Sequence, residues 1–204
     1  MILVVFALEE EAKDFRRWLA KNPRGVRVEL MGVGAEAVAA RLPGLLERWK
    51  PDRLIAAGFA GALTEEWQIG DVVCPENFST VEAGSLRRAV LHSSDEVIEG
   101  REERAAIARE AGASCVDMES ATVARIAAER GVPLLVLRVI TDVPGAPIPV
   151  PFGVTYDLAR QKVRVAATIF WLMRHPLHWM EFGRFLRTLR FAREALTTAL
   201  TRSV

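Results

Sequence analysis

The chain alternates between short runs of almost wholly apolar residues and longer segments in which apolar residues recur every three or four positions. A short, branched apolar run indicates a buried strand, and a spacing of three to four indicates an amphipathic helix. This alternation predicts an α/β fold of three layers, with a central mixed, mostly parallel sheet flanked by helices. The expected strands are residues 2–7, 26–31, 53–58, 71–74, 89–92, 114–116 and 134–140, and the expected helices are 9–20, 35–49, 101–111 and 119–129.

The last quarter of the chain has a different pattern. Residues 143–151, VPGAPIPVP, hold four prolines in nine positions and predict a loop. From Asp157 onward the composition is helical, with a break expected at Pro176. We therefore expect a domain over residues 1–156 and a helical carboxyl extension over 157–204, packed on that domain or continuous with it.

The last expected helix is amphipathic and basic. An apolar side carries Phe182, Leu186, Leu189 and Leu196, and arginines step by three along another side at positions 184, 187, 190 and 193. Such a helix suits an anionic lipid surface, its own domain or a second subunit about equally well.

Composition narrows the class of protein. A chain of 204 residues that is half hydrophobic and has a net charge of +1 fits one domain with a sizeable core, and its balance does not suggest a nucleic-acid partner. Cys74 and Cys115 lack disulfide or metal spacing, as do the three histidines. The amino terminus does not resemble a signal peptide, and residues 165–173 are too few to span a membrane. We expect a cytoplasmic protein without metal or cofactor, at most peripheral on the inner membrane surface.

Three acids stand at corresponding places in the predicted fold. Glu11 follows the first strand, Glu119 begins a helix after the strand at 114–116, and Asp142 follows the last long strand. In an open α/β sheet such ends converge on one edge, where ligands bind. Carboxyl groups held together between apolar walls raise one another's pKa, which lets one of them act as an acid near neutral pH.

Simpler interpretations exist for several of these residues. Acids at helix starts complement the helix dipole, and that is the interpretation we favour for Asp117. The stretch GVGAEA at residues 32–37 is half of a dinucleotide-binding fingerprint. It follows the second strand rather than the first, and no acid closes the next strand, so cofactor binding is disfavoured.

Six motifs in order give the chain a family resemblance. It resembles the superfamily of purine nucleoside phosphorylases and methylthioadenosine/S-adenosylhomocysteine nucleosidases over roughly residues 1–143. The motifs are ALEEEA (7–12), GVGAEAVAA (32–40), AGFAGAL with IGDVV (57–63 and 69–73), SSDEVI (93–98), VDMESATVA (116–124) and VITD (139–142).

The resemblance implies roles for individual residues. Glu11 resembles the acid that activates the attacking water, and Asp142 the general acid that protonates N7 of the purine. Met118 and Glu119 resemble the pair that holds the ribose. The residues matching the base-enclosing segment are Val97 and Ile98, and those matching the small-residue turn beside the ribose are Gly58, Ala60 and Gly61. Breaking an N-glycosidic bond needs such an acid, such ribose contacts and a positioned nucleophile.

Departures from the family pattern refine the expectation. Ala56 and Phe59 stand where phosphorylases often have phosphate-binding Arg and Ser, which weakens the case for phosphorolysis and leaves water or phosphate open as the nucleophile. The stretch 74–93 is short for the family, so we expect an open pocket that suits a large 5′ substituent.

The carboxyl extension resembles that of hopanoid-associated nucleoside phosphorylases, which act on adenosylhopane. This resemblance implies adenine release from a 5′-modified adenosine, with adenosylhopane as the favoured substrate, by an enzyme that forms homo-oligomers. The alternatives are a methylthioadenosine/S-adenosylhomocysteine nucleosidase and a non-catalytic nucleoside-binding or membrane-peripheral module.

Overall fold

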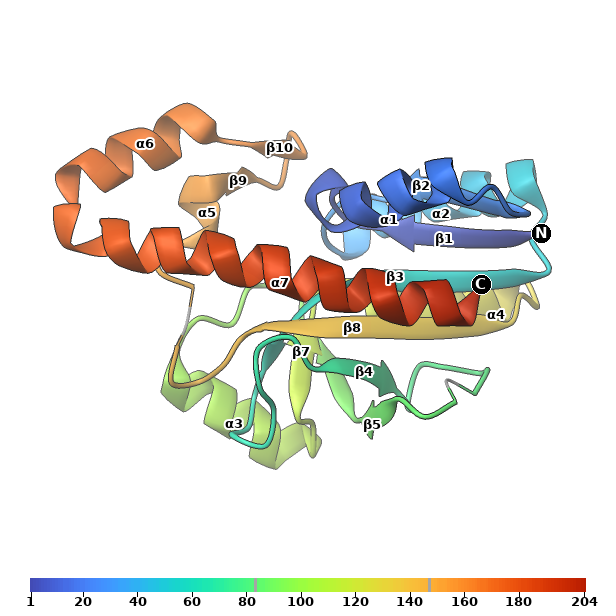
Figure 1. Ribbon diagram of the computed structural model, residues 1–204. Coiled ribbons are helices and arrows are strands. Elements are labelled where there is room, and N and C mark those ends of the chain that lie inside the picture. Colours follow the sequence, from blue (N-terminus) through green and yellow to red (C-terminus); the bar gives the residue numbers. More distant parts are fainter. Residues whose placement is uncertain (83, 147) are drawn as a thin grey trace.

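A computed structural model describes residues 1–82, 84–146 and 148–204 (Figure 1). The strands are β1 (Ile2–Phe6), β2 (Val26–Leu30), β3 (Arg53–Ala62), β4 (Val72–Pro75), β5 (Arg87–Ala89), β6 (Leu91–Ser93), β7 (Cys115–Asp117), β8 (Leu134–Asp142), β9 (Tyr156–Asp157) and β10 (Lys162–Val163). The helices are α1 (Glu9–Lys21), α2 (Ala35–Trp49), α3 (Arg101–Ala111), α4 (Ser120–Glu129), α5 (Phe152–Thr155), α6 (Val165–Arg174), a short 3-10 turn η1 (Pro176–His178) and α7 (Trp179–Ser203).

The main sheet is mixed and mostly parallel, as expected. Its strands run in the order β2-β1-β3-β8-β4-β5, with β7 joining β3 and β6 joining β7. The pairs β4–β8 and β3–β7 are antiparallel, whereas the other pairs of this sheet are parallel. The strand β8 is buried at all nine positions, which explains its nearly continuous apolar sequence.

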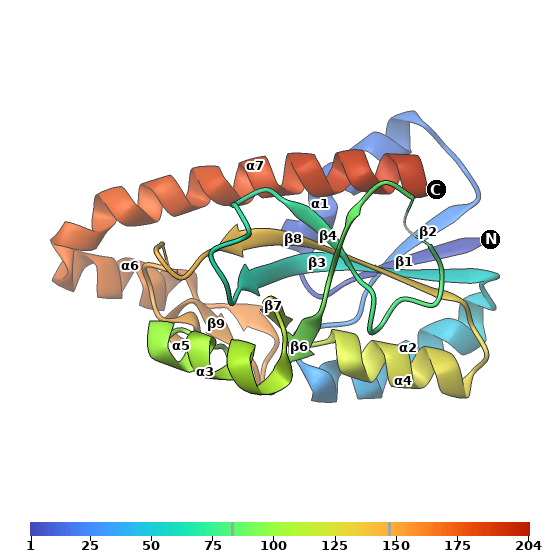
Figure 2. The same cartoon turned by 90° about the horizontal axis from the view of Figure 1, so that it is seen from below.

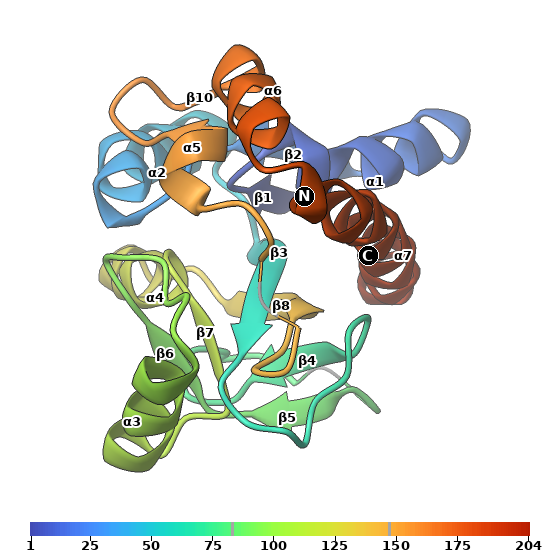
Figure 3. The ribbon, with the colours of Figure 1, turned by 90° about the vertical axis from the view of Figure 1, so that its left-hand side faces the viewer.

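Helices cover both faces of this sheet (Figure 3). On one face α1 and α7 pack against the strands through Phe15 and Leu196, and on the other α2 and α4 pack through Leu42 and Ile126. These side chains are essentially free of solvent contact, and each of them represents about 1.5–3 kcal/mol of favourable apolar burial. The predicted three-layer architecture is confirmed.

The carboxyl segment crosses the end of the sheet before returning along it. Figures 1 and 2 show α6 and the first turns of α7 beyond the carboxyl ends of β3 and β8. The rest of α7 lies along the sheet, where Ala192, Leu196 and Leu200 join the same core cluster as β1 and β3. One long helix therefore belongs to the core at one end and borders the edge where ligands bind in such sheets at the other.

Several expected elements differ in the structure. The single strand expected at 89–92 is two short strands, β5 and β6, which pair with different neighbours. The chain after Asp157 is not wholly helical, because β9 and β10 form a two-stranded hairpin before α6. Asp142 is the last residue of β8 rather than the residue after it. The described part of the loop at 143–151 has no helix or strand beyond an isolated bridge between Val143 and Ala146, and Pro147 lies outside the described residues.

Candidate active site

A cavity of about 470 Å³ opens at the carboxyl ends of the strands. The three acids Glu11, Glu119 and Asp142 all line it, and each of their side chains is buried. They come from three separate elements: α1, the residue before α4, and the end of β8. The fold therefore brings together acids that are more than 100 residues apart at the extremes, as expected for strand ends that share one edge.

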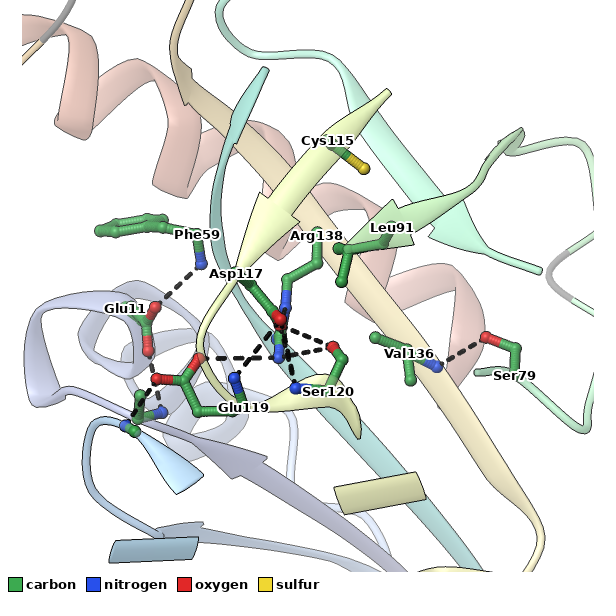
Figure 4. Close-up of polar contacts among 12 residues, drawn as sticks. Glu11, Phe59, Ser79, Leu91, Cys115, Asp117, Glu119, Ser120, Val136 and Arg138 are labelled. Carbon is green, nitrogen blue, oxygen red and sulfur yellow. Dashed lines mark hydrogen bonds and ion pairs between the residues drawn. The ribbon is translucent and has the colours of Figure 1, made fainter. Parts of the chain in front are cut away.

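Glu11 is held by backbone donors. Its Oε2 accepts hydrogen bonds from the N–H groups of Ala7 and Leu8, both at 2.9 Å, and its Oε1 accepts one from Phe59 at 2.8 Å (Figure 4). Burial raises the pKa of this carboxyl above its ordinary value, and the three backbone donors oppose that effect. Because an ionised carboxylate offers about four acceptor positions, one remains for a water or hydroxyl in the cavity.

Glu119 lies above a buried ion pair. Its Oε1 accepts the N–H of Gly34 at 2.9 Å, and its Oε2 is 4.0 Å from Nη2 of Arg138. Arg138 donates through Nε to Oδ2 of Asp117 at 2.7 Å and through Nη2 to Oγ of Ser120 at 3.1 Å (Figure 4). Gly34 reaches Glu119 with a φ of 87°, a conformation that favours glycine. The arrangement leaves Oε2 of Glu119 free to accept hydrogens from a ligand.

Asp117 differs from our sequence interpretation. We assigned it to the helix dipole, and it does accept the N–H groups of Glu119 and Ser120 at the start of α4. It is also the carboxylate that neutralises Arg138, with both side chains about 1% exposed. A buried guanidinium without such a partner is strongly unfavourable, so Asp117 anchors the acid-rich end of the site.

The raised pKa of Glu119 predicts how the stability of the protein depends on pH. Burial, followed by the neighbouring Asp117 charge, raises this pKa from 4.5 to about 8. Between these pH values the folded state holds a proton that the unfolded state has lost, so this residue makes stability fall as pH rises through that window. We expect the melting temperature of Glu119→Gln minus that of the wild type to be higher at pH 8 than at pH 5, by about 3 °C or more. Thermal unfolding at both pH values measures this, and an equal difference at the two would contradict the shift.

Asp142 is paired with a second buried arginine. Its Oδ2 is 2.5 Å from Nη2 of Arg104 on α3, and its Oδ1 accepts the hydroxyl hydrogen of Thr141 at 3.0 Å. Burial raises the pKa of the Asp142 carboxyl above its ordinary value, and the Arg104 guanidinium opposes that effect. Asp142 therefore combines the burial that lets a carboxyl hold a proton with a cation that stabilises its ionised form.

The remaining predicted residues fall into two groups. The walls of the cavity include Met118, Ala60, Gly61, Val97 and Ile98. Gly58 is not among the residues that form these walls within the described chain. A Cβ at Gly58 would lie 2.8 Å from Oε1 of Glu11 and 3.0 Å from Nη1 of Arg138, so this glycine makes room for the acid and the arginine rather than for a ligand.

The far side of the cavity is apolar and comes from the carboxyl segment. Its wall there is lined by Phe152, Tyr156, Val163, Val165, Ile169, Leu172, Phe182, Phe185, Leu186 and Leu189. Val163, Val165, Ile169 and Leu186 are each more than half exposed as well, so they form an apolar mouth. The cavity thus runs from an acidic inner end to an apolar opening between α6 and α7.

The amphipathic basic helix expected from the sequence is α7, and its apolar side faces the protein. Phe182, Leu186 and Leu189 line the cavity, and Leu196 lies in the core. Arg193 is buried, donates through Nε to Asp14 at 3.0 Å and also pairs with Glu10. Arg193 therefore differs from Arg184, Arg187 and Arg190, which are exposed, because α7 turns position 193 toward α1.

Comparison with known proteins identifies the family. The family model described as the phosphorylase superfamily matches residues 2–88 and 79–170, which is more than half of the chain. The chain belongs to the phosphorylase superfamily. It is accordingly an enzyme of that superfamily. The acids described above lie in the cavity of its α/β fold.

Two superfamily relatives are 5′-methylthioadenosine/S-adenosylhomocysteine nucleosidases. That of Actinobacillus succinogenes is 26% identical over 159 residues, covering 59% of this chain and 69% of the relative. That of Thermotoga maritima is 25% identical over 151 residues, covering 61% and 69%.

Solved structures support the same fold over nearly the whole chain. Futalosine hydrolase of Helicobacter pylori aligns with a TM-score of 0.66 and 17% identity, covering 98% of this chain and 97% of that one. The 5′-methylthioadenosine nucleosidase of Arabidopsis thaliana aligns with a TM-score of 0.68 and 18% identity, covering 98% and 93%. At these identities the likeness shows the fold alone.

The two buried arginines that pair with acids of the cavity, Arg104 and Arg138, were not predicted from the sequence. Arg138 interrupts the apolar run LLVLRVI, and a charge inside a strand buried on both faces is a signal that could have revealed an ion pair. Arg104 lies in REER at the start of a helix, where an exposed arginine is ordinary, so its burial could not be predicted from its neighbours in the chain.

The described part of the chain lacks two further features, a cluster of metal ligands and a helix that could cross a membrane. Within residues 1–82, 84–146 and 148–204, His, Cys, Asp and Glu side chains form no cluster of three or more that is suited to a metal ion. The same residues include no helix with the length and apolar character needed to cross a bilayer.

Proposed function

We propose that this superfamily member releases adenine from adenosines that carry a large apolar group at the 5′ position, with adenosylhopane as the favoured substrate. The observation that carries the proposal is the shape of the cavity, which has three carboxyl groups at its inner end and an apolar mouth between α6 and α7. A nucleoside bound with its base and ribose among the acids would direct its 5′ group to that mouth. Hydrocarbon is the chemistry that such a mouth favours.

In this proposal Asp142 protonates the base. As the C1′–N9 bond breaks, its electron pair passes to the purine, and the proton of the Asp142 carboxyl goes to N7. Glu119 accepts hydrogens from the ribose hydroxyls, an interaction that strengthens as the ribosyl group becomes cationic. Met118 packs against the ribose, and Val97 and Ile98 enclose the base.

Glu11 is proposed to activate the nucleophile. A water bound at the free acceptor position of its carboxylate adds to C1′, and its proton passes to Glu11. Among the described residues that line the cavity, Arg104 is the single Lys or Arg, and it is paired with Asp142. Phosphate binding favours an available cation, so we propose hydrolysis rather than phosphorolysis.

The nucleophile can be identified directly. We expect the rate of adenine release from a 5′-alkylthioadenosine to be the same in phosphate-free buffer and with millimolar phosphate, and the second product to be the free 5-substituted ribose. Liquid chromatography of both products measures this. Release that requires phosphate and yields a sugar 1-phosphate would contradict hydrolysis and leave the glycosidic cleavage intact.

A second candidate keeps the same chemistry with a smaller substrate. Both relatives described above are methylthioadenosine/S-adenosylhomocysteine nucleosidases. In that reading the α6–α7 mouth receives a methylthio or homocysteine group. The dependence of rate on the length of the 5′ group separates the two candidates.

The turn between α6 and α7 suggests where a lipid-like substrate would be met. Leu177 and Met180 are 88% and 72% exposed, and Phe170, Met173 and Trp179 are more than half exposed. We call these five residues the α6–α7 tip. The tip lies beside the apolar mouth, since Phe170 and Met173 are on the same helix as Ile169. An apolar tip with exposed arginines nearby has the character of a helix pair that lies in the headgroup region of an anionic membrane.

Vesicle binding tests this part of the proposal. We expect the protein to sediment with anionic phosphatidylglycerol vesicles more than with neutral phosphatidylcholine vesicles, and Arg184→Glu with Arg187→Glu to weaken the anionic binding by about tenfold at low salt. Arg109→Glu with Arg130→Glu, two charge reversals at exposed positions of α3 and the end of α4, is the matched control and should bind as wild type does. Equal binding of the wild type, the Arg184/Arg187 variant and the control to anionic vesicles would contradict a membrane surface at the α6–α7 tip. So would the absence of binding by all of them.

A further inference from the structure

The ion pair between Arg104 and Asp142 is built into the fold at three points. Arg104 is 2% exposed, and each of its three guanidinium nitrogens contacts a different oxygen atom. Its Nε donates to the carbonyl of Ile98 at 3.0 Å, its Nη1 donates to the carbonyl of Ala62 at 3.1 Å, and its Nη2 lies 2.5 Å from Oδ2 of Asp142. The arginine therefore links α3, the base-enclosing segment and β3 to the end of β8.

The backbone of β3 is shaped around this pair. The register between β3 and β8 shifts between Ala60 and Gly61, so the strand is irregular beside Asp142. A Cβ at Gly61 would lie 3.0 Å from Oδ2 of Asp142 and 3.4 Å from Nη1 of Arg104. A larger residue would push on both charged groups, which gives this glycine a steric reason of its own.

Other charged groups face the same cavity from different elements. Glu10 and Glu11 come from α1, Glu96 from the segment before α3, and Asp117 and Glu119 from the junction of β7 and α4. Among the described residues that line the cavity, Arg104 is the cation, and it is in contact with Asp142 rather than with any of these acids. Its charge is thus directed at one carboxyl.

We propose that Arg104 is a positioning residue that holds the Asp142 carboxyl at the cavity wall and stabilises the carboxylate left when the proton passes to N7. The inference rests on the proposed function of Asp142. A buried carboxyl alone keeps its proton too firmly to be an effective acid, whereas a guanidinium in contact makes the loss of that proton less costly. Thr141 fixes the other oxygen, so the two contacts together leave the carboxyl little freedom to turn.

The test is the pH profile of adenine release by the wild type, Arg104→Met, Arg104→Lys and Asp142→Asn. In the wild type the high-pH limb of kcat reports loss of the proton on Asp142. With Arg104→Met the carboxyl holds its proton more firmly, so we expect that limb to move up by about one pH unit or more, and the plateau of kcat to fall by about 10- to 100-fold. Arg104→Lys keeps the charge and should leave the limb near its wild-type position.

A double variant separates positioning from general damage. If Arg104 acts through Asp142, adding Arg104→Met to Asp142→Asn should cost little more in kcat than Asp142→Asn alone. A limb that stays in place in Arg104→Met, or a full further loss in the double variant, would overturn the proposal. The kcat values of Arg104→Met, Asp142→Asn and the double variant are each corrected for the folded fraction of that protein, measured by thermal unfolding. A wild type that releases no adenine at all would instead count against the proposed function.

Discussion

Replacing Asp142 with Asn is expected to lower kcat for adenine release by about 10²- to 10⁴-fold, the range that a general acid contributes. Asn shares the shape of Asp but removes the charge paired with the buried Arg104, so kcat is compared at the folded fraction that thermal unfolding gives for each protein. An amide cannot give a proton to N7, and the purine would have to leave without one. Steady-state assays with a 5′-alkylthioadenosine measure the loss.

Affinity for the nucleoside distinguishes this effect from a damaged pocket. The dissociation constant of a non-cleavable adenosine analogue, measured by calorimetry, should change far less than kcat does in Asp142→Asn. A variant that retains more than a tenth of wild-type kcat would show that another group protonates the base. Adenosine binding without turnover in the wild type would count against the proposed substrate class.

The length of the 5′ substituent is expected to have the second large effect. Each methylene that enters an apolar wall contributes up to about 0.8 kcal/mol, or about three- to fourfold in kcat/KM. We therefore expect kcat/KM to rise by about 10²-fold or more from 5′-methylthioadenosine to 5′-octylthioadenosine, since several methylenes fit beside α6 and α7. Initial rates over this series measure the slope.

Two variants of α7 assign the gain to the cavity wall. Leu186 lines the mouth and is about half exposed, so Leu186→Asp should remove most of the gain for octyl while leaving the methylthio substrate nearly unchanged. Met180 lies on the same helix, is exposed and is not among the residues that line the cavity, so Met180→Asp is the matched control. A flat series in the wild type would favour the smaller substrates of the second candidate.

The layered fold could be predicted from the sequence because each element carries its own signal. The spacing of apolar residues predicts the helix α2, and a continuous apolar run predicts the strand β8. Turns flank both elements in the chain. The hairpin of β9 and β10 could not be predicted in this way. Its strands have two residues each, which is too short for any periodicity to show.

The site was predictable only where residues stand at strand ends. Glu11, Glu119 and Asp142 were expected at one edge because a parallel sheet brings such ends together, and the structure places all three in one cavity. Their arginine partners depend on contacts across the fold. Arg104 on α3 pairs with Asp142, which lies 38 positions later in the chain, so the pattern of nearby residues cannot predict that contact.

The apolar wall shows the same limit. The sequence identified Phe182, Leu186 and Leu189 as one side of a helix, but it left open whether that side faces a core, a second chain or lipid. The structure turns it toward the acids, since α7 begins beyond the strand ends before it joins the core. The direction of an amphipathic face is a property of the packed chain rather than of the helix.

The most direct test of the account is whether the purified wild-type protein releases adenine from 5′-octylthioadenosine at neutral pH without phosphate, followed by liquid chromatography. The account predicts multiple turnovers that yield adenine and the free 5-octylthioribose. An unchanged nucleoside after prolonged incubation with folded protein would contradict the proposed assignment of Glu11, Glu119 and Asp142 to glycosidic cleavage of such a substrate.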